Sequence, residues 1–108
     1  MNESEFLALA EQALGAIEQG LDQACDNDDL DVECSRSGNV LEIECIASCS
    51  KIIVNSQAAM QELWVAAKAG GFHYRHDGKH WRNTRDGSEL FAALSGLVSD
   101  QAQGKVSL

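Results

Sequence analysis

The sequence lacks a hydrophobic run that could cross a membrane, since no apolar stretch approaches the ~20 residues that a spanning helix requires. It also lacks a secretion signal at its start, because Met1-Asn2-Glu3-Ser4-Glu5 is acidic where such a signal would be basic. These two absences predict a cytoplasmic protein with no membrane partner.

Basic residues are scarce and unevenly placed. The chain has 8 Lys and Arg against 17 Asp and Glu, which gives a formal net charge of -9. Residues 1–44 hold twelve acids and one base, Arg36, for a charge of -11, whereas residues 45–108 hold five acids and seven bases, for +2. Because nucleic-acid phosphates require Lys and Arg, this polarity predicts no nucleic-acid partner and favours cations or a basic protein surface.

The four cysteines contain no Cys-x-x-C pair, and the missing export signal indicates a reducing compartment that keeps them as thiols. Cys34 and Cys45 fall where apolar residues alternate, so we expect them to be small buried hydrophobic residues. Cys25 stands beside Asp26 in an acidic segment, and its spacing alone leaves open whether it binds a soft metal.

The first predicted element is an amphipathic helix. Asn2 followed by Glu5 fits an N-terminal cap, and apolar residues then recur at helical spacing over residues 6–24. Gly15 and Gly20 each weaken such a helix by up to ~1 kcal/mol, so its stability must come mainly from packing. We expect the helix to end near Gly20.

Several segments in the middle of the chain are typical of strands. Residues 35–39 provide a turn, Asp77-Gly78-Lys79 favours a hairpin bend, and residues 60–68 are compatible with either a helix or a strand. The strand segments, which alternate between apolar and polar residues or are rich in β-branched or aromatic ones, are residues 30–34, 40–45, 51–55, 72–76 and 80–83.

A second amphipathic helix is predicted over residues 90–98, with Ser88 as its cap. The order of helix, strands and helix predicts the α+β class, with a two-layer sandwich in which both terminal helices pack on one face of a mainly antiparallel sheet. The length of 108 residues predicts a single domain over residues 1–108.

Acidic residues crowd the first helix, the following loop and the first strand. Glu18 and Asp22 are i,i+4 neighbours on one helical face, and Asp31 and Glu33 share one face of a strand, so like charges repel unless a cation is present. Carboxylate oxygens suit hard cations, and iron accepts them as well. The composition is equally compatible with a solvated surface that serves solubility, and a metal would bind such an open surface weakly.

The sequence contains no motif of a common enzyme class. A nucleophile elbow, a phosphate-binding glycine loop and a dinucleotide fingerprint are all missing. His73, His76 and His80 surround one hairpin without the spacing of a metalloenzyme motif, and we interpret them as solvent-exposed. We therefore expect no catalytic residues.

Trp64 is a candidate for contact with a protein partner. If residues 60–68 form a strand, Leu63 and Val65 face the core together and Trp64 faces solvent. An exposed tryptophan on a sheet is a candidate hot spot. Hydrogen-bonding groups nearby are expected from Asn55, Gln57 and Gln61.

Over essentially its whole length the chain resembles the frataxin family, in its bacterial branch. The order of asparagine, glutamine and tryptophan along the chain is the distinctive part of the resemblance. The stretches that carry it are residues 1–6, 30–33, 50–57, 61–66, 70–74 and 78–81.

The resemblance implies a helix-flanked antiparallel sheet in which residues 61–66 form a strand and Trp64 is exposed. It implies a protein that binds Fe2+ or Fe3+ weakly at its surface and that regulates or supplies iron for iron-sulfur cluster assembly. The implied partners are the cysteine desulfurase and its scaffold protein, and the implied state is a monomer that could form oligomers with iron. The implied metal ligands are Glu18, Asp22, Asp26, Asp28, Asp29, Asp31 and Glu33, and the implied partner-binding residues are Asn55, Gln57, Gln61 and Trp64.

The chain departs from the family pattern in several places, of which two bear on the turn before residue 61 and on iron binding. It contains no proline, although the family usually has one in the stretch between Gln57 and Gln61, so we expect a looser turn there. Gln19, Gln23 and Ala24 also thin the acids at the end of the first helix, which predicts a lower capacity for iron. Two alternatives therefore stay open: a ferroxidase that acts on the same acids, and a generic acidic module that binds other metals or proteins.

Overall fold

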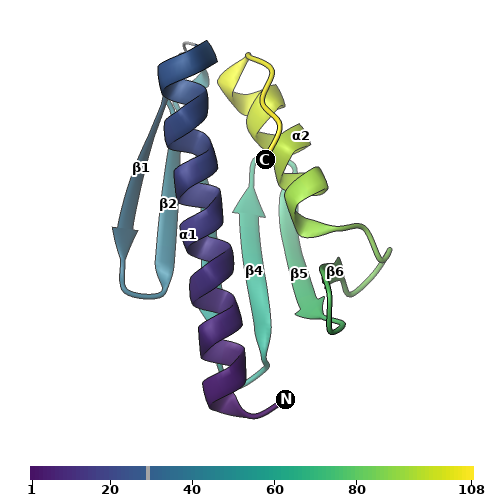
Figure 1. The fold of residues 1–108 in the computed structure, drawn as a ribbon. Coiled ribbons are helices and arrows are strands. Elements are labelled where there is room, and N and C mark those ends of the chain that lie inside the picture. Colours follow the sequence, from purple (N-terminus) through teal and green to yellow (C-terminus); the bar gives the residue numbers. More distant parts are fainter. Residues whose placement is uncertain (29) are drawn as a thin grey trace.

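Two helices cover one face of an antiparallel sheet (Figure 1). The computed structural model describes residues 1–28 and 30–108, with the side chain of residue 28 left out. The described residues form α1 (Glu3–Asp28), β1 (Val32–Ser37), β2 (Val40–Cys45), a short 3-10 helix (Ile46–Ser48), β3 (Ser50–Gln57), β4 (Glu62–Ala67), β5 (Gly70–His76), β6 (Trp81–Asn83) and α2 (Leu90–Ala102).

The six described strands pair in the order in which they occur along the chain, and every pair is antiparallel. The predicted class, sandwich and helix placement are therefore confirmed. The ambiguous segment 60–68 contains strand β4, which pairs on both sides, with β3 and β5. The predicted turn over residues 35–39 is too long, because Ser37 pairs with Val40 and only two residues connect the strands. Gly38, with φ +59°, supplies the left-handed conformation that this tight bend requires.

Helix α1 begins as predicted but ends later. The side chain of Asn2 accepts a hydrogen bond from the Glu5 backbone N–H at 2.8 Å, which confirms the cap. The expected end near Gly20 is wrong, because the helix continues to Asp28. A Cβ atom at Gly20 would lie 2.9 Å from Leu108 Cδ2, so the glycine makes room for the C-terminal tail. Leu21, beyond the glycine, is fully buried, and its packing stabilises the last turns.

Helix α2 is capped by Glu89 and not by Ser88. The Glu89 carboxylate accepts hydrogen bonds from the backbone N–H groups of Phe91 at 2.7 Å and Ala92 at 3.2 Å. Ser88 instead donates its hydroxyl hydrogen to Asp86, at 2.6 Å. A carboxylate suits this position because the first turn of a helix carries a partial positive charge.

The core lies between the helices and the sheet. Cys45 is fully buried, as predicted, and Cys34 is half-buried against the core. None of the helices in the described part of the chain is both long and apolar enough to cross a membrane. The largest fully buried side chains come from both layers and include Phe6, Leu14, Ile17, Leu41, Ile43, Ile52, Leu63, Tyr74, Leu90 and Leu94.

Candidate functional site

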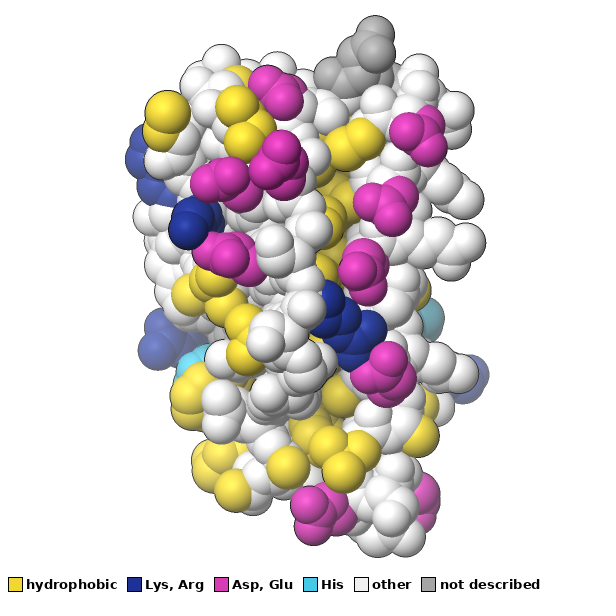
Figure 2. Space-filling model, turned by 90° about the vertical axis from the view of Figure 1, so that its left-hand side faces the viewer, with side chains coloured by type: hydrophobic (Ala, Val, Ile, Leu, Met, Phe, Trp, Pro, Cys, Tyr) yellow, Lys and Arg dark blue, Asp and Glu magenta, His cyan; other side chains and the backbone are white. Residues whose placement is uncertain are grey.

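Carboxylates of α1 and of the β1 region lie on one edge of the molecule, where helix α1 packs beside strand β1. Figure 2 views this edge and shows most of its acidic side chains in the upper part, with hydrophobic side chains between them. Asp22 and Asp26 are exposed on α1, Asp31 is exposed just before β1, and Glu33 is exposed on β1. We define the acidic ridge as the described side chains of Glu18, Asp22, Asp26, Asp31 and Glu33.

Arg36, the one base in the first 44 residues, reaches from β1 to the acids of α1. Its guanidinium forms an ion pair with Glu11 and lies 3.8 Å from Glu18, and its side chain is only 18% exposed. Glu18, a predicted metal ligand, is therefore partly neutralised by a base within the protein. The sequence did not indicate this contact, because it depends on how α1 lies over β1.

The ridge is an open surface and not a cage. Among the residues that the structure describes, no three His, Cys, Asp or Glu side chains are grouped closely enough to share a metal ion. The side chain of Asp28 and all of Asp29, two further predicted ligands, lie outside the described part. The described candidate ligands are thus separate carboxylates on α1 and in the β1 region, and an ion bound to them would keep much of its water.

Two cysteines, Cys25 and Cys34, lie next to the ridge, and Cys34 is poorly suited to bind a metal as a thiolate. Burial, followed by the nearby charges of Asp22, Cys25 and Glu18, raises the pKa of the Cys34 thiol to about 12. The Cys25 thiol is half-buried and donates a hydrogen bond to the Val32 carbonyl at 3.4 Å, which ties the end of α1 to β1. These contacts favour a structural role for both thiols.

A second surface lies on the sheet face that the helices leave open. Trp64 stands between Asn55 of β3 and His73 of β5 in the strand register. Leu63 and Val65 are 0% and 2% exposed, so Trp64 does face away from the core, as predicted. Its indole is nevertheless half-buried, because it stacks on the His73 ring with 4.4 Å between the centroids and 6° between the planes. Trp64 is therefore less exposed than expected.

Glu62 anchors this surface and was not predicted. Its side chain is 6% exposed, and its carboxylate accepts hydrogen bonds from Trp64 Nε1 at 2.9 Å and Arg75 Nε at 2.8 Å. His73 Nδ1 lies 3.4 Å away. Burial opposes ionisation, but the hydrogen bonds from Arg75 and Trp64 outweigh it, and the pKa of the Glu62 carboxyl is lowered. Strand alternation was the signal that could have found Glu62, since it lies two residues before Trp64.

The predicted partner-binding residues take different positions. Asn55 and Trp64 line a hollow of about 150 Å³, and Asn55 Oδ1 is buried with no hydrogen-bond partner among the described atoms. Gln57 is half-buried opposite Glu62 in the register. Gln61 lies in the turn before β4, with φ +53°, and its side chain donates a hydrogen bond to the Met1 carbonyl at 2.8 Å. The position beside the indole that was expected for Gln61 is taken by Glu62. We define the tryptophan patch as Asn55, Glu62, Trp64, His73 and Arg75.

These observations define a small α+β sandwich with two candidate binding surfaces, an acidic edge and an aromatic patch on the open face of the sheet. The chain belongs to the frataxin family, whose Frataxin-like domain model matches residues 1–104. The iron-sulfur cluster assembly protein CyaY of Janthinobacterium sp. (strain Marseille) is 67% identical over 101 residues, covering 94% of this chain and 90% of that protein. The protein of the same name from Herminiimonas arsenicoxydans is 62% identical over 108 residues, covering 100% and 96%.

Two solved structures have the same fold. Frataxin from Psychromonas ingrahamii superposes with a TM-score of 0.83 at 29% identity, covering 99% of this chain and 97% of that chain. Trimeric frataxin from Saccharomyces cerevisiae, complexed with ferrous iron, has a TM-score of 0.73 at 20% identity, covering 87% and 85%. At this identity the yeast protein supports the fold alone.

Proposed function

We propose that this protein binds iron weakly on the acidic ridge and supplies it to, or regulates its use in, the assembly of iron-sulfur clusters. The relatives that are 62% and 67% identical over nearly the whole chain are named iron-sulfur cluster assembly proteins, which supports a role of this chain in that process. We choose iron as the ion because carboxylate oxygens accept it, and a frataxin of the same fold, from yeast, has been solved as a ferrous complex. We place this activity in the cytoplasm.

One observation carries the iron-binding part of the proposal. Asp22, Asp26, Asp31 and Glu33 are exposed on adjacent elements, and none of them forms an ion pair with another described residue. Unpaired carboxylates at an open surface attract hard cations but do not enclose them. Iron would therefore be a loosely held cargo, in either oxidation state, and could also bridge copies of the chain into oligomers.

The same surfaces would receive the protein partners. We propose that the acidic ridge docks on a basic surface of the cysteine desulfurase, since opposite charges steer such encounters. The tryptophan patch, together with Gln57, would contact the scaffold protein, because a rigid aromatic side chain with hydrogen-bonding neighbours is typical of an interface hot spot.

The docking proposal is tested by titrating labelled protein with purified cysteine desulfurase at low and at high salt. We expect the amide signals of residues 18–33 to shift or broaden selectively at low salt and to recover at high salt, because exposed charges are screened beyond about 8 to 10 Å. Signal changes that are the same at low and high salt, or that affect only residues outside 18–33, would contradict docking through the ridge.

We also propose that the protein is not an enzyme. Iron uptake measured with and without oxygen separates binding from ferroxidase activity, which would oxidise Fe2+ faster than the uncatalysed reaction. We expect equal Fe2+ binding without oxygen and no acceleration of its oxidation. Comparison with Ca2+ and Mg2+ tests the generic acidic module, for which these ions would perturb the ridge as strongly as iron does.

A further inference from the structure

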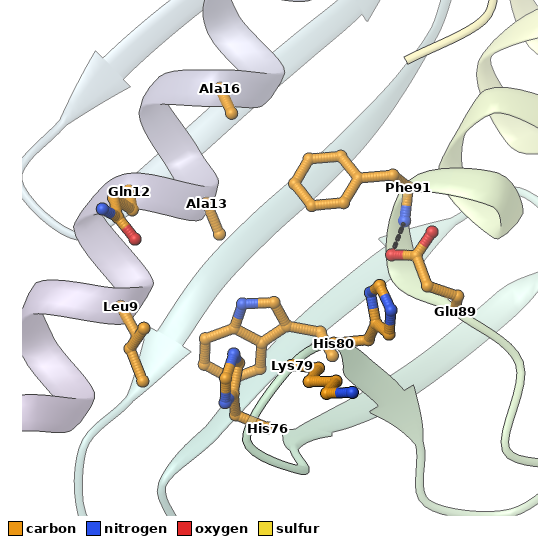
Figure 3. Close-up of a pocket in the computed structure, with 10 residues that line it drawn as sticks. Leu9, Gln12, Ala13, Ala16, His76, Lys79, His80, Glu89 and Phe91 are labelled. Atoms are coloured by element: carbon orange, nitrogen blue, oxygen red, sulfur yellow. Dashed lines mark hydrogen bonds between the residues drawn. The ribbon is translucent and has the colours of Figure 1, made fainter.

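A groove distinct from the ridge and the patch lies between α1, the β5–β6 hairpin and the start of α2. Figure 3 shows Leu9 and Ala13 on the α1 side, Phe91 on the α2 side, and the hairpin side chains His76, Lys79 and His80 between the two helices. Its volume of about 270 Å³ is slightly below the range of about 300 to 1,000 Å³ that is usual for small-molecule sites. The groove therefore suits a ligand smaller than most drugs.

The wall of the groove is apolar. Ala13 and Trp81 are each 4% exposed, and Leu9 and Phe91 are half-buried, so their surfaces border the groove without filling it. His76 meets the Trp81 indole edge to face, with 5.1 Å between the ring centroids. An aliphatic or aromatic ligand body would gain the contacts that these side chains now lack on one side.

The rim that the hairpin contributes is basic. None of His76, Lys79 and His80 forms an ion pair within the described part of the chain. The hairpin's acid, Asp77, is already engaged, since it accepts hydrogen bonds from the backbone N–H groups of Lys79 at 2.9 Å and His80 at 2.8 Å. His76 Nδ1 accepts a hydrogen bond from the Gly78 N–H at 3.1 Å, so Nε2 is the nitrogen that can donate to a ligand.

One carboxylate also borders the groove and limits the charge of the ligand. Glu89 lines it, although its oxygens are bound to the first backbone N–H groups of α2. This fixed negative charge would repel a doubly charged phosphate more than a singly charged group. Lys79 is a point charge without the planar fork by which arginine clamps a phosphate.

We propose that this groove binds a small monocarboxylate with an apolar body, the carboxylate toward His76, Lys79 and His80 and the body against Leu9, Trp81 and Phe91. The complementarity of a basic rim and an apolar wall identifies the ligand class. The site is independent of the iron ridge, so the proposal does not rest on the proposed function.

The first test titrates 15N-labelled protein with four probes of the same ring and different charge: phenylacetate, 2-phenylethanol, phenethylamine and phenyl phosphate. We expect phenylacetate to shift the signals of Ala13, Ala16, Trp81 and Phe91, with the alcohol and the amine at least about threefold weaker, as one exposed charge contact predicts. Equal binding of the alcohol or the amine, tighter binding of phenyl phosphate, or no selective shift would overturn the proposal.

Two variants locate the site. Ala16 lines the groove but is exposed on α1, so Ala16→Phe should fill the groove, keep the fold and abolish the phenylacetate shifts. Ala8→Phe, at an exposed position of α1 outside the groove, is the matched control and should change nothing. Retained binding in Ala16→Phe would overturn the proposal.

A charge variant, Lys79→Gln, tests the proposal even if Ala16→Phe does not fold. Lys79→Gln should weaken phenylacetate binding about two- to fivefold. Lys105→Gln, which removes an exposed lysine beyond α2, should leave binding unchanged. Equal effects of the two lysine variants would also overturn the proposal.

Discussion

The acidic ridge and the tryptophan patch both present charged side chains at the surface, but they are built in opposite ways. On the ridge, Asp22 and Asp26 are exposed and form no ion pair among the described residues. In the patch, Glu62 is buried and its carboxylate is held by Trp64 and Arg75. The exposed carboxylates of Asp22 and Asp26 repel one another and have no positive partner among the described residues, whereas the negative charge of buried Glu62 is balanced by Arg75 and stabilised by the Trp64 N–H.

This difference separates two kinds of recognition. The contacts proposed for the ridge are long-range electrostatic ones, so they should depend on salt and tolerate imprecise geometry. The patch fixes the orientation of an aromatic ring before any partner arrives, which reduces the entropy that binding must overcome. Changes to the ridge should therefore alter binding, and changes to the anchor of the patch should alter stability.

The largest effect is expected when the ridge loses its charge. The variant Asp22→Asn/Asp26→Asn/Asp31→Asn/Glu33→Gln should weaken cysteine desulfurase binding about tenfold or more at low salt, since each exposed ion pair contributes about 0.2 to 1 kcal/mol. Its unfolding midpoint in urea should not fall, because repulsion among the acids is relieved. The control Glu3→Gln/Glu5→Gln removes exposed acids at the other end of α1. If the control weakens binding as much, the effect belongs to net charge and not to the ridge.

Removal of the anchor of the patch should have the next largest effect. Glu62→Ala leaves Trp64 Nε1 and Arg75 without their acceptor, which should lower the free energy of unfolding by about 1 to 3 kcal/mol. Glu42→Ala is the matched control, because Glu42 lies on the same face of the sheet and pairs with exposed Lys51 at 2.8 Å. That pair should contribute less than about 1 kcal/mol. Equal losses in urea unfolding would show that Glu62 is an ordinary surface acid.

The pH dependence of stability sharpens the same contrast. Because the pKa of Glu62 is lower in the folded protein, its ionised form stabilises the fold above the unfolded pKa of about 4.3. This stabilisation disappears as the pH falls through the lower folded value. The stability difference between the wild type and Glu62→Gln should therefore shrink between pH 6 and pH 3 in urea unfolding. A difference that stays constant or grows over this range would contradict the lowered pKa.

Period-two alternation predicted the strands and the direction in which Trp64 faces, because Leu63 and Val65 had to share the core side. The same alternation places Glu62 on the face of Trp64. The contacts of Glu62 with His73 and Arg75 were beyond prediction, since they require the register of β4 against β5, and no local pattern determines that register.

The errors at the two helix ends have different origins. Gly20 looked like a helix stop, but its role is set by the approach of Leu108 from the far end of the chain. The cap at Glu89 replaces Ser88 because a carboxylate two residues before Phe91 reaches the first free N–H groups. Local preference identified both helices, a tertiary contact decided where α1 ends, and the choice between two adjacent local caps decided where α2 begins.

The smallest effect is expected at Arg36, where a charge of the ridge is compensated from within. Arg36→Gln removes the partner of Glu11 and Glu18, which should raise the affinity of the ridge for Mn2+ about threefold, because one nearby positive charge no longer opposes the cation. Mn2+ broadening of the amide signals of residues 18–33 measures this affinity. Lys51→Gln, which frees Glu42 on the sheet face, is the control and should leave the ridge unchanged. Unchanged broadening in Arg36→Gln would mean that Glu18 takes no part in binding the cation, and the ion site would then lie with Asp22, Asp26, Asp31 and Glu33 alone.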